Sequence, residues 1–142
     1  MEYRFYGSDD CDVVPINNEY QDIRDPRYLY DLLSKIWCKY TCAPRMRKDW
    51  SKENKTLGQC SITSFLAQDI FGGEVFGIRL PDGGFHCYNY VDGKVFDLTS
   101  EQFSRKLHYD LENPQSRAEH FAKEEKYQRY LYLKNELNKR HG

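Results

Sequence analysis

The chain has 142 residues, with 21 basic and 22 acidic side chains and a net charge of -1. This length suits one domain with a single core, and the balanced charge gives no overall attraction to nucleic acid or to an anionic membrane. No apolar run approaches the roughly 20 residues that span a bilayer, and the N-terminus lacks the apolar region of a signal peptide. We therefore expect a cytoplasmic protein that binds neither nucleic acid nor membrane.

Five cysteines are present, which is an odd number. In a chain without a secretory signal, this favours free thiols over a disulfide framework. Cys38 and Cys42 have a spacing that suits a metal, but no further ligands are evident near them and no CxxC motif occurs. We expect no metal site and no cofactor, and a metal-binding protein that uses Cys38, Cys42 and Cys87 is kept as a third alternative.

Residues 1–24 are polar and mixed, and they are predicted to form an N-terminal extension. The pattern leaves open whether this segment packs on the domain, forms a short edge strand or is disordered. Asp25-Pro26 begins a helix, because an N-cap residue is followed by proline in the first turn. The helix is predicted to end near Cys42, and its apolar stripe contains Leu29, Leu32, Leu33, Ile36, Trp37 and Tyr40.

The basic stretch 45–55 is predicted to be a loop that leads into a second helix. Its charges indicate a solvated surface more than a rim that attracts an acidic substrate. For Trp50, two interpretations stay open: the ring walls a cleft beside Cys60, or it anchors the loop in the core.

The stretch from Leu57 to Asp97 contains the candidate chemistry. Cys60 opens a helix whose apolar positions recur at helical spacing and which Gly72-Gly73 ends. A cysteine in the first helical turn lies beside free backbone amides and the positive end of the helix dipole, which favours the thiolate.

Three strands are predicted next, over 74–80, 85–91 and 94–99. Asp92-Gly93 is the pair favoured in a type I′ turn, and a two-residue loop there fixes the register so that Val91 faces Lys94. His86 and Asp97 then become diagonal neighbours on one face of the sheet, within reach of a side-chain hydrogen bond. By alternation, Asn89 lies on the other face, which argues against a direct catalytic role for it.

A cysteine, a histidine and an aspartate are the residue types of a thiol nucleophile, its base and the group that orients the base. The side chain of Gln59 either donates to an oxyanion or makes a structural hydrogen bond to the loop. The competing interpretation treats Cys60 as a packed core residue, since cysteine is often buried and five cysteines with four histidines offer many chance pairs.

The C-terminal third carries no further candidate site. Asp69 lies within the apolar stripe of its helix and is predicted to need a buried partner. Thr99 with Gln102 resembles a capping box, and a last helix is predicted from Asn113-Pro114 or Ser116 to about Asn138. No pattern ties three further histidines to Cys60, and they are predicted to be surface or core residues: His108, His120 and His141.

These elements predict an α+β fold with helices packed on a small antiparallel sheet, in one domain over 25–142. Four blocks in order resemble the YunG-like family of small bacterial proteins: Trp50 with 58–63; 68–74; 86–89; and 92–103. The resemblance implies a papain-like or transglutaminase-like fold with Cys60 as nucleophile, His86 as base and Asp97 as orienter. It implies a class of mechanism and leaves the substrate open.

The leading prediction is a cysteine-dependent hydrolase or acyltransferase that acts on an amide or peptide bond of a peptide, a protein or a small amide. The alternative is a noncatalytic module that binds a peptide or partner on the same fold. The pKa of the Cys60 thiol distinguishes the two, because only the enzyme needs a thiolate near neutral pH. Nothing in the sequence indicates the oligomeric state.

Overall fold

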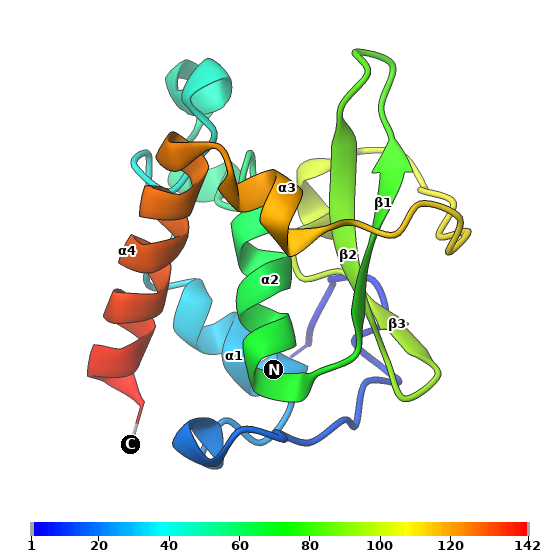
Figure 1. Ribbon diagram of the computed structural model, residues 1–142, viewed down its shortest axis with the longest axis vertical. Coiled ribbons are helices and arrows are strands. Elements are labelled where there is room, and N and C mark those ends of the chain that lie inside the picture. Colours follow the sequence, from blue (N-terminus) through cyan, green and yellow to red (C-terminus); the bar gives the residue numbers. More distant parts are fainter. Residues whose placement is uncertain (1, 142) are drawn as a thin grey trace.

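The computed structural model describes residues 2–141, which form a helical layer packed on a small sheet (Figure 1). The sheet has three antiparallel strands in the order β1 (Glu74–Arg79), β2 (Phe85–Val91) and β3 (Lys94–Phe96). Helix α2 (Cys60–Phe71) lies between the sheet and helix α4 (Glu124–Arg140), with α1 (Pro26–Leu33) and α3 (Arg117–Phe121) beside them. The predicted α+β class with a small antiparallel sheet is therefore confirmed. Short 3-10 helices cover Asn18–Tyr20, Pro44–Asp49, Lys52–Asn54 and Ser100–Gln102.

The apolar face of α2 forms the centre of the core. Ile62, Phe65, Leu66 and Ile70 are all completely buried, as the helical spacing predicts. The helix stops at two glycines with positive φ, Gly72 at 80° and Gly73 at 72°. This ending turns the chain directly into β1, so that the helix lies against the sheet that follows it.

The first helix is shorter than predicted. Asp25 caps it by accepting a hydrogen bond from the Tyr28 amide at 3.1 Å, but the helix ends at Leu33 and not near Cys42. Turn-like backbone hydrogen bonds continue to Trp37, whose amide donates to the Leu33 carbonyl at 2.9 Å. Side-chain bonds are added to them: the Ser34 hydroxyl donates to the Tyr30 carbonyl, and the Cys38 amide donates to the Thr41 hydroxyl.

The N-terminal segment packs on the domain. Phe5, Cys11, Val13, Tyr20 and Ile23 are buried in the same hydrophobic cluster as the helices. Tyr6 forms a single β-bridge with Asp97, whose amide donates to the Tyr6 carbonyl at 3.0 Å. Asp97 directly follows β3, which ends at Phe96, three residues before the end of the predicted strand 94–99.

The prediction of one continuous C-terminal helix was wrong: the structure has two helices there, α3 and α4. Ser116 caps α3 by accepting from the Glu119 amide at 3.2 Å, and α4 starts anew at Glu124. Asn113-Pro114 pairs with β1 instead of starting a helix: the Gly77 amide donates to the Asn113 carbonyl at 2.8 Å. This pairing covers an edge of the sheet that would otherwise expose unpaired backbone groups.

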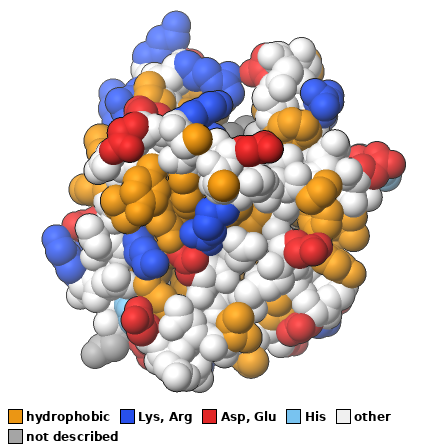
Figure 2. Space-filling model, viewed as in Figure 1, with side chains coloured by type: hydrophobic (Ala, Val, Ile, Leu, Met, Phe, Trp, Pro, Cys, Tyr) orange, Lys and Arg blue, Asp and Glu red, His pale blue; other side chains and the backbone are white. Residues whose placement is uncertain are grey.

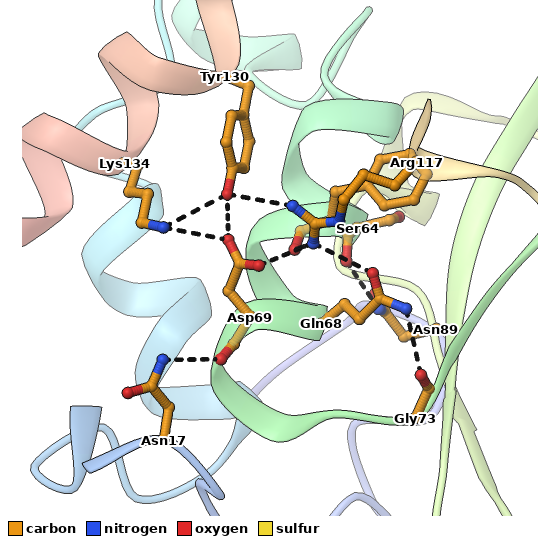
Figure 3. A network of polar contacts seen from close by, with 10 residues as sticks. Asn17, Ser64, Gln68, Asp69, Gly73, Asn89, Arg117, Tyr130 and Lys134 are labelled. Atoms are coloured by element: carbon orange, nitrogen blue, oxygen red, sulfur yellow. Dashed lines mark hydrogen bonds and ion pairs between the residues drawn. The ribbon is translucent and has the colours of Figure 1, made fainter. Parts of the chain in front are cut away.

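Asp69 has the partners that its predicted burial requires. Its carboxylate accepts from Arg117 at 2.7 Å, lies 3.5 Å from the Lys134 ammonium and is bonded to the Tyr130 hydroxyl (Figure 3). The network joins the C-terminal half of α2 to α3 and α4. It therefore fixes the orientation of α2, whose other end carries Cys60.

The surface seen in Figure 2 has positive, negative and hydrophobic side chains interspersed over the same face. This distribution agrees with the balanced overall charge. Within residues 2–141, no helix combines the length and apolar character that a membrane crossing requires.

We predict that Gly73→Ala lowers the free energy of unfolding by about 2–4 kcal/mol, measured by urea denaturation. Gly73 has a positive φ, and an added Cβ would lie 2.3 Å from the Tyr90 carbonyl oxygen. Gly83→Ala is the control, because Gly83 also has a positive φ but has open space around it. It should cost only about 1–2 kcal/mol for the backbone conformation. Equal losses in the two variants would show that the close contact has no effect.

Candidate active site

Cys60 is the first residue of α2, and the turn before it is held by hydrogen bonds and close packing. Gly58 precedes it with φ 71°, and an added Cβ there would lie 2.6 Å from the Cys42 sulfur, so the backbone passes too closely for a side chain. The Gly58 amide donates to the Gln102 side chain at 3.3 Å, and the Gln102 amide group donates to the Thr99 carbonyl at 3.0 Å. Gln102 therefore links the turn before Cys60 to the segment that follows Asp97.

The Cys60 side chain is partly exposed and lines a cavity of about 940 Å³. His86 lines the same cavity from the start of β2, and Gln102 and Phe103 contribute to its wall. The cysteine is thus accessible to a small molecule, in contrast to Cys11, Cys42 and Cys87, which are buried.

His86 and Asp97 form the predicted contact. The register between β2 and β3 pairs Val91 with Lys94 and Asn89 with Phe96, as a two-residue turn requires, and Asp92 and Gly93 both have positive φ. The Nε2 atom of His86 lies 2.6 Å from an Asp97 carboxylate oxygen, and each side chain is only 1% exposed. The strand pattern thus brings the imidazole and the carboxylate together inside the protein.

Asp97 is well supplied with hydrogen-bond donors. Besides His86, its oxygens accept from the Tyr109 hydroxyl at 2.8 Å and from the Thr99 amide and hydroxyl at 3.1 and 3.3 Å. The Thr99 hydroxyl therefore serves Asp97, and the predicted capping box is absent although Ser100–Gln102 does form a short helix. Tyr109 was missed by sequence reasoning, because it lies in an irregular segment with no pattern to place its hydroxyl.

The pKa values of His86 and Cys60 shift in opposite directions. Burial alone would lower the pKa of His86, but the charge and hydrogen bond of Asp97, together with Cys60, outweigh it and raise the pKa to about 10. The other ring nitrogen, Nδ1, is buried and has no conventional hydrogen-bond partner within residues 2–141. Since Nε2 is held by Asp97, Nδ1 is the nitrogen left to exchange a proton with Cys60.

A second cysteine contributes to the state of Cys60. The pKa of the Cys60 thiol is held well below its ordinary value by a hydrogen bond with Cys87 and, against the effect of burial, by His86. The pKa of Cys87 is raised well above its ordinary value by the same hydrogen bond and by burial. Of the two neighbouring thiols, Cys60 is therefore the more acidic. The position of Cys87 directly after His86 in β2 was the only sequence signal for its contact with Cys60.

Gln59 and Trp50, predicted as possible cleft residues, do not line the cavity. Gln59 is completely buried and its amide group donates to the Cys38 carbonyl at 3.2 Å, which is the structural alternative. The Trp50 indole donates to the Lys55 carbonyl at 2.9 Å and so anchors its own loop. Both side chains satisfy polar groups of the backbone near them, and this keeps them away from Cys60.

His120, predicted to be unconnected with Cys60, lines the cavity with it. Its Nε2 atom lies 2.8 Å from the Gln115 side-chain oxygen and 4.0 Å from the Cys87 sulfur. Its Nδ1 atom lies 2.9 Å from the Lys126 ammonium. Because the chain breaks between α3 and α4, His120 and Lys126 both line the cavity. The predicted continuous helix did not indicate that these two side chains would lie together.

Asn89 lies on the face of β2 opposite His86, as alternation predicts, and donates to the Ser64 carbonyl of α2 at 2.9 Å. Within residues 2–141, no group of three or more histidine, cysteine, aspartate or glutamate side chains is placed to hold a metal ion. Cys38 contacts Thr41, whereas Cys87 contacts Cys60 and His120, so the cysteines of the third alternative lie in different surroundings.

The fold and site define an α+β protein with a cysteine at a helix start beside a buried His–Asp pair. The family model described as YunG protein matches residues 25–142, and the chain belongs to this family. It is similar to the "Uncharacterized protein YunG" of Bacillus subtilis (strain 168), with 37% identity over 99 residues that cover 68% of this chain and 80% of the relative. No solved structure matches the chain.

We predict that Asp97→Asn lowers the free energy of unfolding by about 3 kcal/mol near pH 6, because a buried imidazolium loses its counter-charge. The folded-state pKa of His86 is raised to about 10 from 6.5, so its stabilisation is complete below 6.5 and is lost as the pH rises through 10. The difference between the wild type and the variant should therefore shrink between pH 6 and pH 10, measured by urea denaturation. Asp12→Asn, in an exposed ion pair, is the control and should cost at most about 1 kcal/mol. A pH-independent loss at Asp97 would contradict the charge pairing.

Proposed function

We propose that the protein is a cysteine-dependent hydrolase or acyltransferase that acts on an amide-type bond. The observation that carries the proposal is the partly exposed Cys60 thiol in a cavity with His86, whose ring is held by a buried Asp97 at 2.6 Å. A thiolate facing an imidazolium is the resting state that nucleophilic attack by cysteine requires. The proposal includes a papain-like order, with cysteine at a helix start and histidine and aspartate on the sheet that follows.

In the first step the Cys60 thiolate attacks the carbonyl carbon, and the carbonyl π electrons move to its oxygen. The first α-helical turn has backbone amides without intrahelical partners, and the Cys60 amide is the proposed donor to this oxyanion. His86 then donates its Nδ1 proton to the leaving amine as the C–N bond breaks, which gives an acyl-enzyme and a neutral imidazole.

In the second step, water or an acceptor amine gives a proton to His86 and attacks the acyl-enzyme, which releases the Cys60 thiolate. Asp97 stays ionised throughout and holds the ring so that Nδ1 faces the sulfur. Tyr109 and Thr99 support Asp97 in this role, because their hydrogen bonds hold the carboxylate in the orientation that contacts His86.

We predict that iodoacetamide labels Cys60 at pH 6.5 about tenfold faster than a free cysteine, measured by peptide mass spectrometry over time. A free thiol with a pKa of about 8.5 is about 1% ionised there, and the lower nucleophilicity of a more acidic thiolate removes roughly half of the logarithmic gain. His86→Ala should move the pH profile of labelling toward that of an ordinary thiol. His108→Ala, at an exposed position outside the cavity, is the matched control and should leave the profile unchanged.

Acyl transfer has its own readout. With p-nitrophenyl acetate, an acetyl adduct on Cys60 should form and then disappear, and His86→Ala should slow both steps. A fast-reacting Cys60 that never accumulates or releases an acyl group would instead favour the noncatalytic binding module. A thiol with an ordinary pKa would rule out the proposed mechanism.

A further inference from the structure

The cavity that contains Cys60 also contains a lysine with no acidic partner. Lys126, near the start of α4, is partly buried and lines the cavity, and no carboxylate of residues 2–141 lies within 4.0 Å of its ammonium group. Its hydrogen bond is to His120 Nδ1 at 2.9 Å. A half-buried ammonium without a counter-ion is unusual, because removing a charge from water is costly unless it is paired.

The partners of His120 make the direction of this hydrogen bond clear. The Gln115 oxygen, 2.8 Å from His120 Nε2, can only accept, so the Nε2 atom carries the proton of this hydrogen bond. The remaining nitrogen, Nδ1, accepts from Lys126. Burial and the neighbouring Lys126 charge lower the pKa of His120 to about 4, which agrees with a neutral ring. Lys126 is thus held in place by a neutral acceptor and not by a carboxylate.

The other charges around the cavity are either paired or exposed. Arg129 is bonded to Glu125 at 2.5 Å, and Arg45 to Asp82 at 2.9 Å. Glu112 and Glu119 are exposed and therefore screened by solvent. Burial lowers the pKa of Lys126, while the sulfurs of Cys87 and Cys60 oppose this effect. Lys126 and Cys60 line the same cavity. Among the described residues, Lys126 is therefore a partly buried cation of the cavity that has no carboxylate partner.

We propose that Lys126, held by His120, binds a carboxylate of the substrate, so that the preferred substrate is an amide with a free carboxylate near the scissile bond. This inference rests on the proposed function and narrows its substrate class. A carboxylate would supply the counter-charge that the protein leaves out, and charge-assisted hydrogen bonds of this kind are the stronger ones. The other two ammonium hydrogens remain for this contact, because His120 accepts only one.

Two pairs of alkylating probes test the proposal on the full chain. Iodoacetate and iodoacetamide differ in charge, as do N-iodoacetylglycine and N-iodoacetylglycinamide, which place the carboxylate further from the reacting carbon. In each case the Cys60 thiolate forms a C–S bond with the methylene carbon while the C–I bond breaks and iodide leaves. We compare the rate constant of the anionic probe with that of the neutral probe. Their ratio does not depend on the fraction of Cys60 that is ionised, because both probes react with the same thiolate.

For one pair at least, the rate ratio at Cys60 should exceed the ratio of a short cysteine peptide by about tenfold. Lys126→Gln should bring the ratio to that of the peptide, and Lys126→Arg, which keeps the charge, should retain most of the preference. Lys139→Gln is the matched control on the same helix, because Lys139 is 72% exposed and pairs with Glu136. It should leave the ratio unchanged.

The proposal is overturned if the wild-type ratios equal those of the peptide, or if folded Lys126→Gln keeps the wild-type ratios. In the second case Lys126 affects only the ionisation of Cys60, because the rates of the anionic and the neutral probe then change by the same factor. The wild-type comparison stands even if Lys126→Gln does not fold. Failure of the proposed function would be seen separately: the pH profile of Cys60 labelling by the neutral probe iodoacetamide would then give an ordinary thiol pKa.

Discussion

The arrangement of the site depends on the contact between one carboxylate and one imidazole inside the protein. His86 and Asp97 are each 1% exposed, and an isolated buried charge of either kind would be unfavourable by several kcal/mol. The pair is tolerated because the described chain directs four hydrogen bonds to the oxygens of Asp97, from His86, Tyr109 and both polar groups of Thr99. A strand, the turn after β3 and the loop that contains Tyr109 therefore all contribute donors to a single side chain.

The irregular segment from Thr99 to Tyr109 supplies several of the contacts around Asp97 and Cys60. The segment after β3 leaves the sheet so that Thr99 can face Asp97, and Gln102 then continues to the turn before Cys60. The loop up to Tyr109 returns to the same carboxylate, and the Tyr109 ring stacks on Tyr6 with ring centroids 4.1 Å apart. At the other end of α2, the Asp69 network fixes the direction in which the helix presents Cys60 (Figure 3). Loops and helix ends together hold the geometry.

The parts of the site that follow a local period could be predicted from the sequence. Asp92-Gly93 defines the turn, the turn defines the register, and the register places His86 beside Asp97. The start of α2 at Cys60 follows equally from its apolar spacing and its terminal glycines. Tyr109, His120 and Lys126 could not be predicted, because their positions depend on where an irregular loop and a helix break lie in space. Gln59 shows the reverse case: adjacency to Cys60 suggested a role, but the first helical turn directs its side chain to the Cys38 carbonyl.

The β-bridge between Tyr6 and Asp97 joins the extension to a residue of the family region. The family model begins at residue 25, whereas the carbonyl that accepts from the Asp97 amide belongs to residue 6. A homologue without an equivalent of this segment would have to satisfy that amide with water or with another loop. In this chain the backbone of the N-terminal segment therefore contributes directly to the surroundings of Asp97. Loss of the first two dozen residues would therefore expose the backbone amide of Asp97, although none of residues 2–24 lines the cavity that contains Cys60.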